Sequence, residues 1–218
     1  MLQLTFSKRN DSALRILCLG AHCDDIEIGC GGTILKLIEE HSDIEFYWIV
    51  FSQDQQRAHE ARESVDSFLR LVKSKTIVIK NFRDSFFPFI GNAIKEYFEE
   101  VKKEFSPDLI LTHYRNDLHQ DHRLISELTW NTFRNHLILE YEIPKYDGDF
   151  GSPNCFVHLD DAICRKKIRY ILDSFKTQEQ NHWFEEETFL ALLRLRGMEC
   201  NASCKYAEAF YCRKMVLG

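Results

Sequence analysis

The sequence lacks the features that would place it in a membrane or on a nucleic acid. It contains no continuous apolar run of membrane-spanning length, so we expect no transmembrane helix. It contains no cluster of lysine and arginine, and its formal net charge of −6 gives no electrostatic footprint for nucleic acid. Internal repeats, low-complexity tracts and linkers rich in Gly or Ser are absent as well. With 218 residues, we therefore expect one globular domain spanning 1–218.

An export signal and a disulfide framework are also missing. Charged residues interrupt the first segment, MLQLTFSKRNDSALRI, before any apolar stretch of secretory length, so we expect a cytoplasmic protein. The eight cysteines include no CxxC pair, and a chain of this size can build a core without disulfides. We interpret the group Cys200, Cys204 and Cys212 as buried thiols in preference to a structural zinc site.

What the sequence does contain is an alternation of apolar runs and amphipathic segments. The apolar runs that we predict to be strands span 15–21, 45–52, 75–82, 108–114, 136–143 and 154–159. The segments that we predict to be helices span 33–41, 55–72, 92–105, 122–135, about 160–176 and 184–197. The first four strands are almost continuously apolar, as in strands that are covered on both faces.

This order of elements predicts the fold class. Strands that alternate with helices favour a layered α/β fold with a mainly parallel sheet. Two strand-like runs within 137–160 have no helix between them, so we expect a mixed or antiparallel addition in the late part of the chain. Ligands in open α/β sheets bind beyond the carboxyl ends of the strands. That rule selects the segments 21–25, 52–57, 83–88 and 113–122.

The first selected segment belongs to LGAHCDDIEIGCGGT (19–33), where a histidine and two aspartates end a predicted strand. Histidine and aspartate both bind zinc, and here they are His22, Asp24 and Asp25. Adjacent aspartates in a tight loop cannot easily face the same ion, so one would coordinate and the other would face the ion's water. We expect the helix to start near 31–33, after glycines that permit a sharp turn. Helix capping by an aspartate and a phosphate cradle are the alternatives for this segment.

The last selected segment carries a denser group of the same residue types. In DLILTHYRNDLHQDHR (108–123), an apolar run leads to His113, Asp117, His119, Asp121 and His122. This density favours a metal site over a polar loop with an aspartate cap. Zinc suits such ligands, and iron or manganese suits them as well.

Together the two loops predict a site for metal-assisted hydrolysis. Three protein ligands with one open position are typical of catalytic zinc, which lowers the pKa of its bound water. A nearby carboxylate can take the proton of that water, and a further histidine can stabilise an oxyanion or protonate a leaving amine. This equipment suits the hydrolysis of an amide or an ester.

The stretches AHCDDIEIGCGGT and HYRNDLHQDHR resemble the PIG-L/LmbE-type metal-dependent N-deacetylases, which carry an AHPDD motif after the first strand and an HxDH motif after a later one. Less specific matches to the bacterial sugar and natural-product branch of the family are RAHEA (57–61), YEIP (141–144), PNCFVHL (153–159) and KYAEAF (205–210). The resemblance covers about residues 14–212 and, with the order of elements, implies a Rossmann-like three-layer α/β/α sandwich. It makes 1–218 a single LmbE-like deacetylase domain.

The resemblance also implies a metal centre with an adjacent base. His22 and Asp25 match the first two metal ligands of the family, and His122 matches the third. Zn²⁺ is the expected cofactor, and another divalent metal such as Fe²⁺ is the alternative. Asp24 matches the general base that activates water.

Further roles follow from the same resemblance. His119 matches the histidine that stabilises the tetrahedral intermediate, and Asp121 would orient His119 or His122. Arg57 falls where the family often has a substrate-contacting arginine, with an ordinary surface arginine as the alternative. The sequence departs from the family at Cys23, which replaces the usual proline; we interpret it as a packing residue, with a fourth-ligand role as the alternative.

The function implied is a hydrolase that removes an acetyl group from an N-acetylated amino sugar by attack of zinc-bound water. The substrate is expected to be a small molecule, namely a glycoside, a sugar nucleotide or a small conjugate, and the protein could form a homo-oligomer. Two alternatives stay open: an amidase or esterase that acts on a non-sugar conjugate, and a non-catalytic protein that holds a metal to bind a glycan. The aromatic stretch RDSFFPF (83–89) could line the acceptor side of a pocket or belong to the core.

Overall fold

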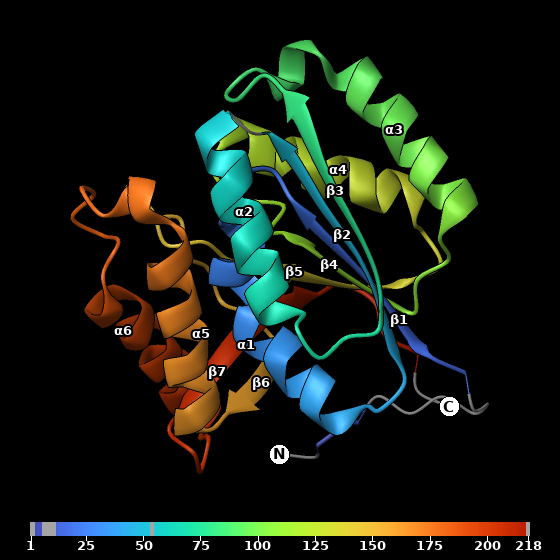
Figure 1. Cartoon of the computed structure of the whole chain (residues 1–218). Helices are drawn as coiled ribbons and strands as arrows, with labels where there is room; N and C mark the ends of the chain where they lie inside the picture. The colour runs from blue at the N-terminus through green and yellow to red at the C-terminus, as the bar shows by residue number, and fades with distance from the viewer. Residues whose placement is uncertain (1–2, 6–11, 53–54, 217–218) are drawn as a thin grey trace.

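The computed structural model describes residues 3–5, 12–52 and 55–216. Its centre is a seven-stranded sheet in the order β3-β2-β1-β4-β5-β7-β6 (Figure 1). The strands span Leu14–Gly20 (β1), Ile44–Ser52 (β2), Ser74–Phe82 (β3), Leu109–His113 (β4), Leu137–Tyr141 (β5), Cys155–Leu159 (β6) and Tyr206–Cys212 (β7). The helices span Asp25–Glu40 (α1), Gln55–Phe68 (α2), Gly91–Glu104 (α3), Gln120–Thr132 (α4), Asp161–Ser174 (α5) and Glu186–Glu199 (α6), with 3₁₀ turns at Phe87–Phe89 (η1) and Lys176–Gln178 (η2).

The pairing of the strands confirms the predicted α/β fold with a mainly parallel sheet. Strands β1 to β5 are all parallel to their neighbours within that group. Strand β7, which the apolar pattern did not predict, lies antiparallel between β5 and β6. The late part of the chain is therefore an antiparallel addition, as expected, although the two strand-like runs within 137–160 are not neighbours in the sheet. Within the described ranges, no helix has both the length and the apolar character needed to cross a membrane.

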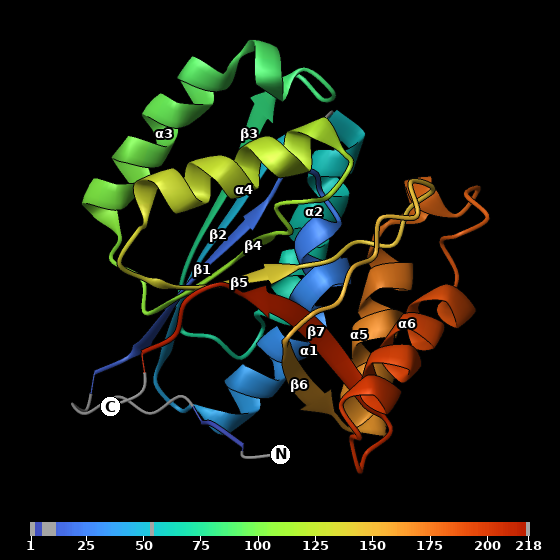
Figure 2. The ribbon, with the colours of Figure 1, turned by 180° about the vertical axis from the view of Figure 1, so that it is seen from behind.

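The sheet separates two apolar cores, which makes the fold three-layered. Along β1, Ile16 and Cys18 belong to one core, whereas Leu17 and Leu19 belong to the other. Alternate side chains of a strand point to opposite faces, so a strand buried on both faces must be apolar at nearly every position. Helices α3 and α4 cover one face, and α1, α2, α5 and α6 cover the other (Figures 1 and 2).

Helix α1 begins at Asp25, six residues or more before the predicted start at 31–33. The expected role of the glycines in a sharp turn is therefore wrong, because they lie inside the helix. A Cβ atom added to Gly29 would lie 2.2 Å from the ring of Tyr141, and one added to Gly32 would lie 2.4 Å from Leu159. The glycines thus allow α1 to pack closely on the sheet, and this packing fixes the position of Asp25.

A buried ion pair holds the middle of α1 against α5 and β7. The Nζ atom of Lys167 donates to the carbonyl of Ile28 and to Glu208, each at 2.6 Å. Glu208 also accepts hydrogen bonds from the amides of Gly32 at 2.8 Å and Thr33 at 2.6 Å. Both charged side chains are only 3% exposed. Because every charge here has a partner, the pair anchors the helix that carries the first part of the candidate site.

Candidate metal centre

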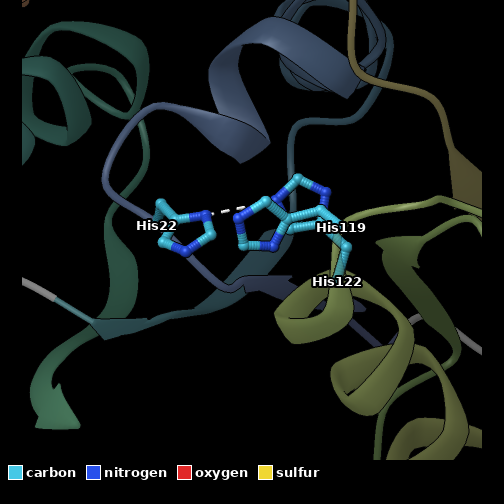
Figure 3. A group of neighbouring side chains, drawn as sticks. All are labelled: His22, His119 and His122. Carbon is cyan, nitrogen blue, oxygen red and sulfur yellow. Dashed lines mark hydrogen bonds between the residues drawn. The ribbon is translucent and has the colours of Figure 1, made fainter. Parts of the chain in front are cut away.

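The histidines and aspartates of the two motifs meet at the carboxyl edge of the parallel strands. His22 follows β1, and Asp25 is the first residue of α1. His119 and His122 lie at the start of α4, just beyond β4. Figure 3 shows the imidazole of His22 facing those of His119 and His122 across the space between the two segments. The topology thus brings together residues about one hundred positions apart, as the carboxyl-edge rule predicted.

The donor atoms of His22, Asp25 and His122 have the spacing of a metal-binding triad. His22 Nδ1 lies 3.1 Å from His122 Nε2 and 3.4 Å from Asp25 Oδ2. Asp25 Oδ1 lies 3.5 Å from His122 Nε2. Ligand atoms about 2.0 to 2.2 Å from a tetrahedral zinc ion are about 3.3 to 3.5 Å from one another. The three side chains therefore offer ligand atoms close to the spacing that one small ion needs. Among the described residues, three overlapping groups could hold an ion: His22 with His119 and His122, Asp25 with His113 and His122, and His22 with Asp84 and Asp121.

The partners of the two imidazoles fix which nitrogen of each ring faces Asp25. His122 Nδ1 lies 2.9 Å from Asp117, and His22 Nε2 lies 3.0 Å from Asp84. Each carboxylate favours a proton on the nitrogen that it contacts, so the other nitrogen of each ring is the one that can bind a cation. In this structure those two nitrogens, His22 Nδ1 and His122 Nε2, form a hydrogen bond of 3.1 Å; although burial opposes it, the carboxylates of Asp25, Asp121 and Asp84 raise the pKa of His22 well above its ordinary value. A divalent metal would take the place of the shared proton, and the donor set of two imidazoles and a carboxylate fits it.

Asp25 is held as an anion at the amino end of α1. Burial favours the protonated form, but the neighbouring imidazoles of His122, His113 and His22 lower the pKa of Asp25 well below its ordinary value. Its Oδ2 atom also accepts the backbone amide of His22 at 2.6 Å. The amino terminus of a helix stabilises a negative charge, which adds to this effect.

Asp24 lies beside the triad and does not cap the helix. It occupies the N-cap position of α1 but makes no side-chain capping bond, which removes the capping alternative. Its Oδ1 atom lies 3.0 Å from Nη2 of Arg57. Burial raises the pKa of Asp24, and the charge of Arg57 only partly opposes that effect. A carboxylate with a raised pKa is better suited to accept a proton than an ordinary surface aspartate.

His119 is placed as a neutral hydrogen-bond donor. It occupies the N-cap position of α4, and its Nδ1 atom accepts the amide of Asp121 at 3.3 Å. The ring proton of the neutral form therefore lies on Nε2. Burial lowers the pKa of His119, and the nearby charge of His22 lowers it further. The imidazole can thus stabilise a developing negative charge by donating a hydrogen bond.

Asp121 does not have the partner that we predicted. Its carboxylate accepts the amides of Ser85 at 2.7 Å and Phe87 at 3.1 Å, and it lies 3.5 Å from His22 Nε2. The expected orientation of His119 or His122 by this carboxylate is therefore wrong. Asp121 instead joins the loop after β3 to the first ligand, because the first turn of α4 directs its side chain toward that loop.

Three residues of the site were not assigned a role from the sequence. Asp117 contacts His122, accepts the amide of His119 at 2.8 Å and lies 2.9 Å from Lys145. Asp84 contacts His22 from the loop after β3. Asp117 belonged to the dense cluster and Asp84 to a selected carboxyl-edge segment, so both carried a signal. Lys145 follows β5, and no pattern in the sequence distinguished it.

His113 and Cys23 lie beside the triad. His113 is fully buried; its Nε2 atom accepts the amide of Ala21 at 2.9 Å and lies 3.2 Å from Asp25 Oδ2, and its ring stacks on that of His122 with the centroids 4.0 Å apart. The Sγ atom of Cys23 donates to the carbonyl of Ser52 at 3.5 Å. Burial raises the pKa of Cys23 to about 12, so its thiol stays protonated at neutral pH. All eight cysteines are free thiols, and none belongs to a metal-binding group of the described residues.

The fold and the donor set define an α/β protein with a candidate metal centre at the carboxyl edge of its sheet. The chain matches the family described as PIG-L, GlcNAc-PI de-N-acetylase, over residues 17–133, which is more than half of its length. It belongs to this family. The matched range contains both motif segments and ends just after α4.

Solved structures share the fold over nearly the whole chain. The conserved protein TT1542 from Thermus thermophilus is 19% identical with a TM-score of 0.75, covering 94% of this chain and 97% of that one. An N,N'-diacetylchitobiose deacetylase from Pyrococcus horikoshii is 22% identical with a TM-score of 0.69, covering 92% and 84%. GalB, the 4-carboxy-2-hydroxymuconate hydratase from Pseudomonas putida, is 14% identical with a TM-score of 0.72, covering 94% and 98%. Since a deacetylase and a hydratase share this fold, the reaction has to be argued from the site.

Proposed function

We propose that this protein is a zinc-dependent N-deacetylase that removes the acetyl group from an N-acetylated amino sugar. The observation that carries the proposal is the convergence of three ligand-type donors within 3.1 to 3.5 Å of one another, with a buried aspartate beside them. Membership of the PIG-L family and the deacetylase among the structural neighbours support the same reaction. The whole of 1–218 would act as one deacetylase domain.

His22, Asp25 and His122 would hold the ion, which we propose to be Zn²⁺, with another divalent metal such as Fe²⁺ as the alternative. A bound divalent ion of this kind supplies Lewis-acid polarisation of a carbonyl and lowers the pKa of water. The second nitrogens of the two imidazoles contact carboxylates, which fixes the ring orientation and makes the imidazoles better ligands. Asp117 and Asp84 therefore keep the two rings directed at the same point.

Asp24 would act as the general base. Its carboxylate takes a proton from the attacking water as the oxygen approaches the acetamide carbon. The raised pKa of Asp24 lets it keep that proton long enough to pass it to the departing amine. Arg57, 3.0 Å away, orients the carboxylate and limits how far its pKa rises. Contact of Arg57 with the substrate, as the family resemblance implied, remains part of this proposal.

His119 would donate a hydrogen bond to the oxygen of the tetrahedral intermediate. Because Nδ1 accepts the amide of Asp121, the proton of the neutral ring lies on Nε2, which would make this bond. Asp121 acts indirectly, because its carboxylate joins the loop after β3 to His22. Both residues thus serve the reaction, one by contact with the reacting atoms and the other by position.

Acetate release tests the proposed reaction. Protein stripped of metal and reconstituted with Zn²⁺ would be offered N-acetyl sugars, their nucleotide diphosphates and their aryl glycosides, together with N-acetylated amino acids and aryl acetates. We expect acetate only from the amino sugars and only with metal present. Acetate from the non-sugar amides or esters alone would identify an amidase or esterase instead. Metal binding with no acetate from any compound would favour the glycan-binding alternative.

A further inference from the structure

The segment that follows β5 brings a side chain to the metal centre without regular structure of its own. Residues 142–151, which we call the strap, contain no helix or strand. In Figure 2 this segment (gold) leaves β5, extends away from the sheet and returns to β6. Lys145, which contacts Asp117 at 2.9 Å, belongs to it. A segment of this kind is mobile unless other contacts hold it, so the contacts of the strap decide where Lys145 lies.

The guanidinium of Arg196 in α6 holds both ends of the strap. Its Nε and Nη2 atoms donate to the two carboxylate oxygens of Glu142 at 2.6 and 2.8 Å, and Nη2 also donates to the carbonyl of Gly151 at 3.4 Å. Its Nη1 atom donates to both oxygens of Glu199 at 2.8 and 2.7 Å, which fixes the plane of the guanidinium against its own helix. We call the contacts of Arg196 with Glu142 and Gly151 the clamp. Because the first and last residues of the strap are bonded to one planar group, the clamp fixes their separation.

A second set of contacts holds the middle of the strap against the loop after β4. Lys145 Nζ lies 2.6 Å from Asp149, and Asp149 accepts the amide of Leu118 at 2.6 Å. The atom of Asp117 that Lys145 contacts is Oδ2, which also lies 2.9 Å from Nδ1 of His122. A continuous chain of contacts thus leads from α6, through the strap, to a proposed metal ligand.

Position explains the buried ion pair of the clamp better than stability does. The side chains of Arg196 and Glu142 are only 3% and 7% exposed. Removing two charges from water offsets most of their attraction, so an apolar pair would serve a core equally well. An apolar pair lacks the fixed direction of a bidentate bond, however. The strap does not bring surplus charge either, because Lys145 is balanced by Asp149 of the same segment. What the clamp supplies is therefore the position of Lys145.

We propose that Arg196 is a positioning residue of the metal centre: by clamping both ends of the strap, it holds Lys145 on Asp117 and so keeps the imidazole of His122 directed at the ion. Arg196 touches neither the proposed ligands nor the reacting atoms, and it acts only through the strap. This inference rests on the metal ligands of the proposed function but not on the identity of the substrate.

Zinc affinity, measured by chelator competition, tests the clamp without any substrate. We expect Arg196→Met to weaken zinc binding by roughly three- to tenfold, less than the loss of a carboxylate that touches the ligand itself, because Arg196 acts through intervening contacts. Hydrogen–deuterium exchange should be faster at the amides of 142–151 in the same variant. Arg194→Met is the matched control: its guanidinium lies on the same helix and bonds only the carbonyl of Lys205, at 3.1 Å, so zinc affinity should not change.

A double-mutant cycle separates positioning from a general loss of stability. Lys145→Met alone should weaken zinc binding by about the same factor as Arg196→Met, and adding Arg196→Met to it should cause no further loss. An undiminished further loss in the Lys145→Met protein would show that Arg196 acts by another route and would overturn the inference. If Arg196→Met does not fold, Glu142→Gln takes its place in the cycle, because Arg196 then keeps Glu199 as a charged partner. We expect a smaller change in the same direction.

Other outcomes separate the clamp from the proposed function. Faster exchange in the strap with full zinc affinity would overturn the inference, since the strap would then move without consequence for the metal centre. Acetate release together with a zinc affinity that ignores the clamp would leave the deacetylase standing without it. Zinc affinity that depends on the clamp, in a protein that releases no acetate, would support the clamp and not the reaction. A wild type that binds no zinc would overturn the inference together with the ligand assignment.

Discussion

The carboxyl group of Glu27 gives a test of the electrostatics around the site that needs no substrate. Its side chain is fully buried in α1, and burial raises its pKa from 4.5 to about 8. The hydroxyl of Ser64 opposes this effect to a smaller extent. In the unfolded chain the pKa returns to its ordinary value. Between the two pKa values the folded protein therefore holds one more proton than the unfolded chain, and its stability falls as the pH rises.

The size of the effect follows from this displacement of the pKa. Linkage gives about 1.4 kcal/mol for each pH unit inside the interval, which amounts to roughly 2.5 kcal/mol between about pH 6 and about pH 9. Glu27→Gln keeps the shape of the protonated acid but cannot ionise. We expect the free energy of unfolding of the wild type to fall by that amount relative to the variant over this pH range.

Urea unfolding of chelator-treated protein, followed by circular dichroism at several pH values, measures the difference. The exposed residue Glu100 supplies the matched control, because Glu100→Gln makes the same chemical change at a side chain that is not buried. Parallel curves for the wild type and Glu27→Gln would refute the reasoning. They would mean that Glu27 ionises with an ordinary pKa in the folded protein and that its burial does not disfavour the charged form.

Three further predictions concern the supports of the site. Lys167→Met leaves a buried carboxylate without its cation and should destabilise the protein by about 3 to 5 kcal/mol in urea. Lys166→Met, which breaks the more exposed ion pair with Glu39, should cost less than about 1 kcal/mol of stability. Equal losses of stability in the two variants would contradict the expectation that the buried pair matters more. Asp117→Asn should weaken zinc binding by about 10- to 100-fold in a chelator competition, because the imidazole it holds loses a charged partner; unchanged affinity would remove Asp117 from this role. Gly29→Ala should destabilise by about 1 to 3 kcal/mol or more because its Cβ overlaps a buried ring, whereas Gly91→Ala, with no neighbour closer than 3.7 Å, should be tolerated; thermal unfolding compares the two.

The sequence predicted the layers of the fold because both signals it used are local. Continuous apolar runs marked the parallel strands, and amphipathic spacing marked the helices between them. Strand β7 was missed, since its apolar positions are interrupted by the buried carboxylate of Glu208. That residue looks like a surface position until its partner Lys167, 41 residues away in the chain, is known. The start of α1 was placed late because three glycines inside a helix are unfavourable unless close packing requires them.

The candidate site was predictable where its residues share a short segment. His22, Asp24 and Asp25 form one such group, and their neighbourhood in space follows from their place at a strand end. The residues that contact these side chains were harder to predict from the sequence. Asp84 and Lys145 come from other loops, and their contacts depend on how those loops fold over the edge of the sheet. The direction of the Asp121 side chain likewise depends on the first turn of α4, which sequence spacing alone did not determine.

The most direct test of the central claim compares metal content and acetate release in the wild type and in Asp24→Asn. We expect one bound zinc in both proteins, because His22, Asp25 and His122 are the proposed ligands and Asp24 is not one of them. We expect acetate release that is lower by roughly 10²-fold or more in the variant, because Asp24 is the proposed acceptor of the proton of the attacking water. Equal release from the two proteins would contradict the role of Asp24 as the base. Loss of the zinc from the variant would contradict the assignment of the ligands.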